Sequence, residues 1–159
     1  MIHLSGGEVA LVDPEYYEIV NSYRWYSWYN RRRTHYAATN IYQGEAKTIL
    51  LMQHLILPVK PGFEVDHADG NGLNNRRANL RYSTYSQNKA NRPAPRNNTS
   101  GFKGVYKARS GKWTARIMVD YQDRHLGTFA DKEDAARAYN EAALEAWGDF
   151  AHLNEVGMK

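Results

Sequence analysis

The sequence predicts an α+β fold, because three different patterns of strands and helices follow one another along its 159 residues. Residues 1–60 hold short β-branched and aromatic runs, which are typical of strands, around one short helix. Residues 63–91 show two short strands and then a helix, and residues 102–147 show three strands and then a longer helix. The length allows one ordinary domain or two small ones, and it excludes a large multidomain enzyme.

The first pattern is a β-rich part with one helix. Asp13-Pro14 supplies an N-cap and a first helical position, so about two helical turns should follow. Pro58 ends an apolar segment, residues 47–57, for which both strand and helix stay open. The other elements expected here are a strand at residues 8–12, the helix at 16–23, strands at 24–29 and 34–42, and a hairpin turn at 30–33.

The second and third patterns predict a ββα unit and a three-stranded antiparallel sheet packed on one helix. Asp131 and Gly148 are the expected N-cap and stop of the last helix. By strand parity with Ala115 and Ile117, Trp113 belongs to the covered face of the sheet. Small residues give the last helix one flat face: Ala135, Ala138, Tyr139, Ala142, Ala143 and Ala146. The expected elements are strands at 63–67, 79–83, 102–108, 112–121 and 124–129, helices at 84–91 and 132–147, a polar loop at 68–77, and turns at 109–111 and 122–123.

The composition excludes several kinds of site. The chain has no cysteine, which rules out disulfides, thiolate zinc sites and cysteine nucleophiles together. No apolar run approaches the roughly 20 residues that a membrane helix needs, and the N-terminus lacks the pattern of a secretory signal. We therefore expect a cytoplasmic protein, in a bacterial or phage-infected host cell, that does not enter a membrane.

The charge distribution indicates a polyanionic partner. The net charge is only +4, but residues 70–119 contain eleven Lys and Arg and no Asp or Glu. A second stretch without acids, residues 19–44, carries Arg31, Arg32 and Arg33 in a row, while residues 130–159 hold seven acids against three bases. Such long basic stretches, mixed with aromatic residues and asparagine, favour nucleic acid. Arg76 and Arg77 join the three arginines of residues 31–33 as candidate DNA contacts.

Four residues of the middle unit, Asp66, His67, Asn79 and Asn88, have the side chains of a hydrolytic site. An imidazole suits a general base that deprotonates water at neutral pH. A carboxylate and an amide oxygen suit a hard divalent cation such as Mg²⁺ or Mn²⁺. Taken alone, however, a turn histidine with asparagines that satisfy the loop backbone explains the same residues.

The longer pattern decides between these interpretations. Val65-Asp66-His67-Ala68-Asp69-Gly70-Asn71-Gly72-Leu73-Asn74-Asn75-Arg76-Arg77-Ala78-Asn79-Leu80-Arg81, followed by Ser86-Gln87-Asn88, resembles the ββα-metal motif of the HNH homing endonucleases of phages and mobile elements. The subclass that it resembles has Asn as the last motif residue. The resemblance implies that His67 is the general base, that Asp66 and Asn88 hold one Mg²⁺ or Mn²⁺, and that Asn79 fixes the loop and the orientation of His67. Where such proteins often have a His-Arg pair, this chain has Gln53-His54, so His54 either contacts phosphate or only packs.

The third unit resembles the plant ethylene-response-factor (APETALA-two) DNA-binding domain, in the form that is fused to HNH nucleases. The matching segments are Gly104-Val105, Gly111-Lys112-Trp113, Ala115-Arg116-Ile117, Leu126-Gly127-Thr128-Phe129 and residues 133–139. The resemblance implies that the sheet enters the major groove and reads DNA with its outer face. Three candidate contacts, Tyr106, Arg116 and His125, differ from the plant residues, so a different target is expected. The other candidates are Lys103, Lys107, Arg109, Lys112 and Arg124.

Together these observations predict a modular DNA endonuclease. The expected parts are a β-rich leader at 1–60, an HNH core at 61–92, a basic linker at 93–100 and an APETALA-two-type domain at 101–156. The expected reaction is metal-dependent hydrolysis of a DNA phosphodiester, and nicking is the simplest outcome because each chain has one site. The expected partner is double-stranded DNA, bound by a monomer or a weak dimer. A catalytically silent DNA-binding regulator and, more distantly, an RNA-binding or RNA-cleaving protein are the alternatives.

Overall fold

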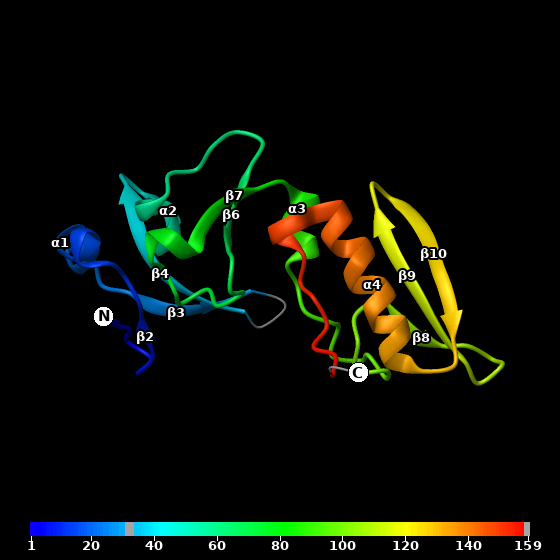
Figure 1. Ribbon diagram of the computed structural model, residues 1–159. Coiled ribbons are helices and arrows are strands. Elements are labelled where there is room, and N and C mark those ends of the chain that lie inside the picture. Colours follow the sequence, from blue (N-terminus) through cyan, green and yellow to red (C-terminus); the bar gives the residue numbers. More distant parts are fainter. Residues whose placement is uncertain (31–33, 158–159) are drawn as a thin grey trace. The chain divides into compact units, whose positions relative to one another are not determined.

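The computed structural model describes residues 1–30 and 34–157 (Figure 1). With 27% helix and 33% strand, in several small sheets, the chain has the α+β fold that the sequence predicts. It divides into two compact units, residues 1–84 and residues 85–159. The helix expected at 84–91, which ends the predicted nuclease core, falls in the second unit. The finer division into four parts stays a prediction.

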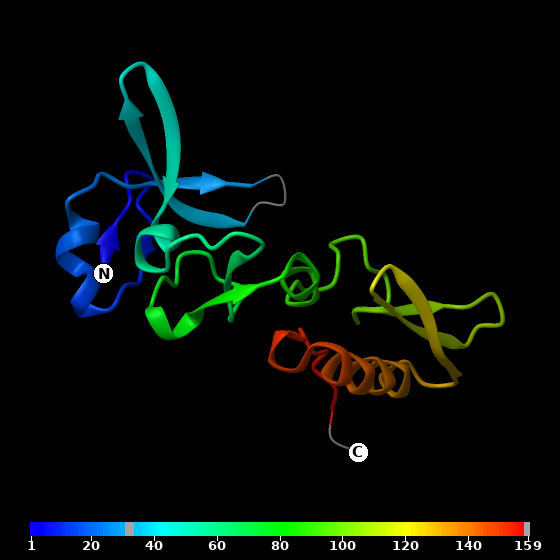
Figure 2. The same ribbon diagram turned by 90° about the horizontal axis from the view of Figure 1, so that it is seen from above.

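The first unit contains three small antiparallel sheets, formed by β1 with β2, by β3 to β5, and by β6 with β7. Figure 2 shows the β4–β5 hairpin projecting from the rest of this unit. The sequence allowed either strand or helix for the apolar segment 47–57. The segment contains all of β5 except Ala46, and then helix α2. The elements are β1 (Ile2–His3), β2 (Val9–Ala10), η1 (Pro14–Tyr16), α1 (Tyr17–Asn21), β3 (Tyr26–Tyr29), β4 (His35–Gln43), β5 (Ala46–Leu51), α2 (Met52–Ile56), β6 (Glu64–His67), η2 (Arg77–Asn79) and β7 (Leu80–Ser83).

One core holds this unit together. Its buried side chains come from the N-terminal strands, α1, β4 and α2, and Leu80 at the start of β7 joins them. Asp13 precedes the helical residues as expected, but its carboxylate caps none of their amides. Its Oδ2 instead accepts a hydrogen bond of 2.6 Å from the backbone N–H of Arg77. The N-terminal residues therefore belong to the same structural unit as the β6–β7 hairpin.

The N-terminal strand region also supports the loop between β6 and β7. The Leu11 N–H donates to the Leu73 carbonyl, and the Leu11 carbonyl accepts from the Asn75 N–H, both at 2.8 Å. On the other side, a Cβ added to Gly72 would lie 2.2 Å from the His35 carbonyl oxygen. Because the loop lies this close to β4, only glycine fits at position 72.

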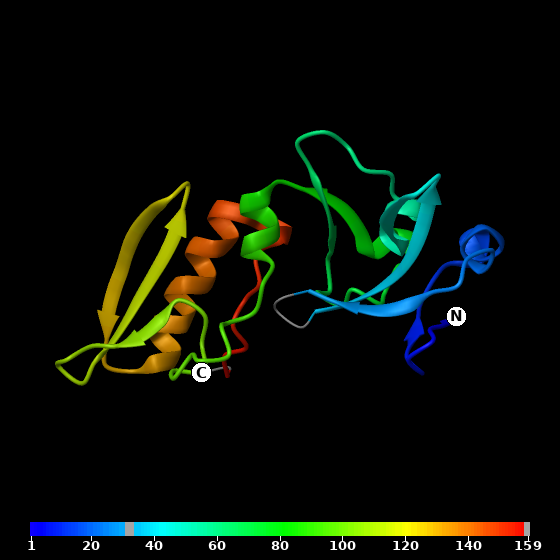
Figure 3. The same cartoon turned by 180° about the vertical axis from the view of Figure 1, so that it is seen from behind.

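The second unit is a three-stranded antiparallel sheet, in the order β10-β9-β8, with α4 along one face (Figures 1 and 3). Asp131 caps α4 as expected, since its Oδ1 accepts from the Glu133 N–H at 2.6 Å. Gly148 ends the helix with a φ of 52°, which favours glycine. No helix in the described part of the chain is long and apolar enough to cross a membrane. The elements are α3 (Tyr85–Ala90), β8 (Val105–Lys107), β9 (Trp113–Val119), β10 (Gln122–Phe129), α4 (Lys132–Trp147) and η3 (Gly148–Phe150).

The turn between β9 and β10 lies two residues earlier than the predicted turn at 122–123, which was wrong. Val119 pairs with Gln122, so Asp120 and Tyr121 form the turn, with φ of 50° and 62°. A two-residue turn with both φ positive matches the right-handed twist of the paired strands. As a consequence, Asp123 becomes a strand residue, opposite Met118.

Strand parity separates the two faces of this sheet. Ala115 and Ile117 are buried in the clusters that pack against α4, and Trp113 packs there too, as the sequence predicted. Arg116 and Met118 alternate with them and are exposed. Residues directly opposite in an antiparallel pair share a face. The outer face, on the side away from α4, therefore carries Tyr106, Thr114, Arg116, Met118, Asp123, His125 and Thr128.

Candidate active site and recognition face

The β6–β7 hairpin places a histidine and a carboxylate side by side at the end of a short strand. Asp66 and His67 are the last two residues of β6, and both side chains are buried, with 6% and 5% exposure. Antiparallel pairing sets Asp66 opposite Arg81 and His67 opposite Leu80. Since Leu80 is part of the core, the pairing fixes the backbone position of His67.

The ring of His67 is oriented by a residue that the sequence did not single out. Its Nε2 lies 3.2 Å from Oδ1 of Asn75, a side chain with 0% exposure. An amide oxygen only accepts hydrogen bonds, so Nε2 carries the proton and the lone pair of the neutral ring is on Nδ1. The ring of Tyr36 lies 5.9 Å from the imidazole, centroid to centroid. Burial lowers the pKa of His67, which favours the neutral base at pH 7.

Asn75 is itself held on both sides. Its backbone N–H donates to Leu11, and its Nδ2 lies 3.5 Å from the carbonyl oxygen of Gly72. The second contact fixes which end of the amide faces the histidine. In the sequence, Asn75 is one of several asparagines in a polar loop, and only the path of the loop distinguishes it from Asn74.

Asp66 also has a partner that the predicted site lacks. Nε of Arg81, from the opposite strand, donates to Oδ2 of Asp66 at 3.0 Å. A buried carboxylate needs such a partner, since desolvation would otherwise penalise its charge. Arg81 thereby supplies an opposite charge beside Asp66 and holds one of its oxygens in place.

The side chain of Asn79 makes its hydrogen bonds within the loop. Its Nδ2 donates to Oδ1 of Asp69 and to the Asn74 carbonyl, at 2.9 and 2.7 Å, and its Oδ1 accepts from the Asp69 N–H. Burial raises the pKa of Asp69, but hydrogen bonds from Asn74, the Asn71 backbone and Asn79 outweigh it and lower the pKa overall. The loop is therefore closed by an ionised carboxylate surrounded by amide donors.

The remaining predicted residues of the nuclease core lie in different surroundings. Asn88 lies in α3, in the second unit. His54 is a half-buried residue of α2, and burial lowers its pKa. Arg76 is exposed, and Nη1 of Arg77 donates to the Leu80 carbonyl at 3.1 Å. Arg31, Arg32 and Arg33 lie outside the described residues.

The outer face of the sheet contains one well-defined charged pair. Nε of Arg116 lies 3.2 Å from Oδ1 of Asp123, and Nη2 lies 2.6 Å from Oδ2. The two side chains therefore form a bidentate ion pair. His125, directly opposite Arg116, is 3.3 Å from the Thr128 hydroxyl through Nε2. Both residues of the ion pair are about half exposed. Asp123 thus holds the Arg116 guanidinium in one orientation on a face that solvent reaches.

Three predicted DNA contacts do not share this face. Arg124 pairs with Ile117 and lines a small hollow with Glu145 of α4. Lys107 pairs with Trp113 and places Nζ over its ring, 5.9 Å from the centroid. Lys103 donates through Nζ to two backbone carbonyls at the end of α3. Parity accounts for the first two, while Arg109 and Lys112 lie exposed in the β8–β9 turn.

Known proteins similar to this chain include two viral proteins, one of which is named an HNH endonuclease. The HNH endonuclease family profile matches residues 58–90, which cover β6, β7 and α3. An uncharacterized HNH endonuclease of Acanthamoeba polyphaga mimivirus is 30% identical over 152 residues, which are 94% of this chain and 76% of that protein. Protein 3.8 of Escherichia phage T7 is 44% identical over 97 residues, which are 60% of this chain and 79% of that protein.

Shorter similarities extend to plant transcription factors. An ethylene-responsive transcription factor of Medicago truncatula is 44% identical over 62 residues, which are 38% of this chain and 23% of that protein. No solved structure matches the chain. The mimivirus relative is matched along most of both chains, and the family profile covers the hairpin that carries Asp66 and His67. The chain therefore belongs to the HNH endonuclease family and is a DNA-cleaving enzyme.

Proposed function

We propose that this enzyme is a metal-dependent, DNA-nicking endonuclease of the Asp-His/Asn/Asn subclass, with His67 as the general base. The observation that carries the proposal is the buried His67, whose Nε2 faces the acceptor oxygen of Asn75. Nδ1 then has the lone pair that takes a proton from the attacking water. Asn75 is a positioning residue in this scheme, and Asn79 supports the loop that delivers it.

Asp66 and Asn88 are the proposed ligands of the divalent cation. A carboxylate and an amide offer only hard oxygen donors, and Arg81 already orients the carboxylate. This donor set fits Mg²⁺ or Mn²⁺, which prefer oxygen ligands and retain several waters. When bound, such an ion supplies charge stabilisation for the leaving oxygen of the phosphodiester. One base and one proposed metal ion per chain favour nicking over double-strand cleavage.

Cleavage of supercoiled plasmid tests the proposal directly. With Mg²⁺ the wild type should give open circles, and EDTA should prevent this. Asp66→Ala and Asn88→Ala should each raise the metal concentration for half-maximal cleavage by about 10- to 100-fold or more, as loss of a supporting residue alone typically does. Glu141→Ala, an exposed acid of α4, is the matched control. Metal titrations of both variants that overlay the wild type would remove these ligands from the proposal.

For recognition, we infer an APETALA-two-type domain whose outer face docks in the major groove of double-stranded DNA. The three-stranded sheet on one helix, the exposed Arg116 and the plant relatives support this inference. Lys112 and Arg109, in the turn at one end of the sheet, are placed at the rim, where phosphates lie. We omit Arg124 and Lys107 from the base-reading set, because they pair with residues of the opposite face.

Arg116→Ala should reduce the base preference at one position of the DNA site. The base preferences at the other positions should stay as in the wild type. A bidentate arginine–guanine contact contributes about 1–3 kcal/mol of discrimination. Lys112→Ala should instead weaken binding equally on all sequences and make log K about one unit less steep in log salt. Binding to a set of single-base variants at several salt concentrations measures both. Equal losses on every sequence for Arg116→Ala would show that it contacts the backbone.

The setting follows from the same proposal. The mimivirus and phage relatives support action inside a virus-infected or bacterial cell, where the DNA is accessible. We propose that the enzyme acts as a monomer or a weak dimer. Sedimentation with and without a DNA duplex measures this, and a stable dimer in free solution would contradict it.

A further inference from the structure

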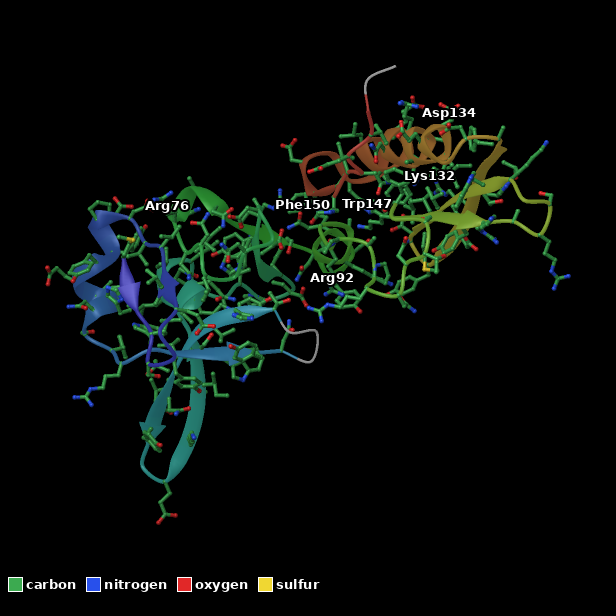
Figure 4. The ribbon with its side chains drawn as sticks, turned by 90° about the horizontal axis from the view of Figure 1, so that it is seen from below. Arg76, Arg92, Lys132, Asp134, Trp147 and Phe150 are labelled. Carbon is green, nitrogen blue, oxygen red and sulfur yellow. The ribbon has the colours of Figure 1, made fainter. Side chains whose placement is uncertain are left out.

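Helix α3 is built into the second unit. It packs against α4 and against η3, and Figure 4 shows Trp147 and Phe150 at this end of α4. Ala90 and the following Asn91 are buried, with 3% and 8% exposure. The backbone N–H of His152, after η3, donates to the Ala90 carbonyl at 3.2 Å. The short helix therefore has a fixed place relative to α4.

Lys103 ties the end of α3 to the sheet domain. Its Nζ donates to the Ala90 carbonyl at 2.5 Å and to the Arg92 carbonyl at 2.6 Å. These are carbonyls that the end of a helix leaves without an intrahelical partner. Burial, together with the nearby charge of Arg92, lowers the pKa of Lys103 to about 8, so the group is still charged at pH 7. Its ammonium serves backbone acceptors rather than the solvent-exposed face.

The backbone of Lys103 is anchored in turn. Its N–H donates to Oδ1 of Asn154 at 2.6 Å, and Nδ2 of Asn154 donates back to the Lys103 carbonyl at 3.0 Å. Asn154 and Asn140 of α4 exchange two further hydrogen bonds, at 2.8 and 2.9 Å. A continuous path of hydrogen bonds thus runs from α4 through Asn154 and Lys103 to the end of α3.

We propose that Lys103 is a positioning residue for metal binding, because it fixes α3, and with it Asn88, to the sheet domain. This inference rests on the proposed role of Asn88 as a metal ligand. Asn88 belongs to the same compact unit as the sheet domain.

The test uses the full chain with Lys103→Met, which keeps the aliphatic stem and removes the donors. The metal concentration for half-maximal cleavage should rise by roughly 10-fold, as for loss of other residues that orient a ligand. Amide hydrogen exchange at residues 87–92 should accelerate, and DNA affinity in EDTA should equal that of the wild type. Lys103→Arg, which retains donors, should stay near the wild type, and so should Lys132→Met, a charge-matched control on α4. In Asn88→Ala, adding Lys103→Met should cause no further loss in metal dependence.

Other outcomes overturn the inference. If Lys103→Met weakens DNA binding in EDTA with a shallower salt dependence, and the metal titration does not move, Lys103 contacts phosphate instead. If hydrogen exchange of α3 is unchanged, Lys103 does not hold the helix. The metal titration of Asn88→Ala distinguishes this from a failure of the proposed function. If Asn88 is not a metal ligand, Asn88→Ala alone leaves the metal dependence of cleavage unchanged. In that event, faster exchange at α3 would leave Lys103 with a structural role only, and the positioning role would be withdrawn.

Discussion

Replacing His67 with alanine is expected to slow cleavage by about 10²- to 10⁴-fold, the usual contribution of a general base. The reason is geometric, since Asn75 occupies Nε2 and leaves the lone pair of the neutral ring on Nδ1. DNA affinity should change little, because the imidazole is only 5% exposed and contributes no formal charge at pH 7. Single-turnover cleavage at saturating Mg²⁺, with binding measured separately in EDTA, gives both quantities.

A second variant controls for the cavity that alanine leaves in a buried site. The His67→Gln side chain has an amide N–H that can still donate to Asn75, but no group that takes a proton at neutral pH. The His67→Gln variant should therefore be as inactive as His67→Ala. Its unfolding temperature should lie closer to that of the wild type. Wild-type cleavage by either variant would show that another group activates the water.

The strands and helices were predictable where local pattern decides them. The β6–β7 hairpin follows from two short segments, with Val65 in one and Leu80 and Tyr82 in the other, on each side of a polar, glycine-containing loop. Helix α4 follows from Asp131, Gly148 and the spacing of small residues. The position of the β9–β10 turn was wrong, because Gln122 and Asp123 are as suited to a turn as Asp120 and Tyr121 are. Only the register of the β9–β10 pair decides between these two turn positions. That register depends on which side chains the sheet buries against α4.

The partners of the site residues were not predictable, because they depend on the path of the loop. Leu73 and Asn75 are held by Leu11, from the N-terminal part, which no local pattern links to them. That contact brings Asn75 to the histidine, while Asn79 bonds to Asp69 instead. Lys103 is a predicted DNA contact by its position in the plant-domain resemblance, and the sequence does not indicate its backbone partners. Its two carbonyl acceptors lie 13 and 11 residues before it in the chain.

Removing the acceptor at position 75 should lower the cleavage rate without altering DNA affinity. Asn75→Leu has nearly the same shape but leaves Nε2 of His67 without its acceptor, so the ring can also carry its proton on Nδ1, where it cannot act as a base. The loss should be roughly 10- to 100-fold, the cost of removing comparable orienting partners. Because the substitution affects the general base, it should lower kcat and leave KM unchanged.

Asn75→Asp provides the matched comparison. Its carboxylate still accepts from Nε2–H, whereas both variants lose the donor that faces the Gly72 carbonyl. The difference between the two variants therefore isolates the hydrogen bond to His67 from the support of the loop. We expect the Asp variant to cleave faster than the Leu variant, and the nitrogen chemical shifts of His67 to report the Nε2–H form in the wild type. Equal losses in both variants, with unchanged shifts, would assign Asn75 to the loop alone.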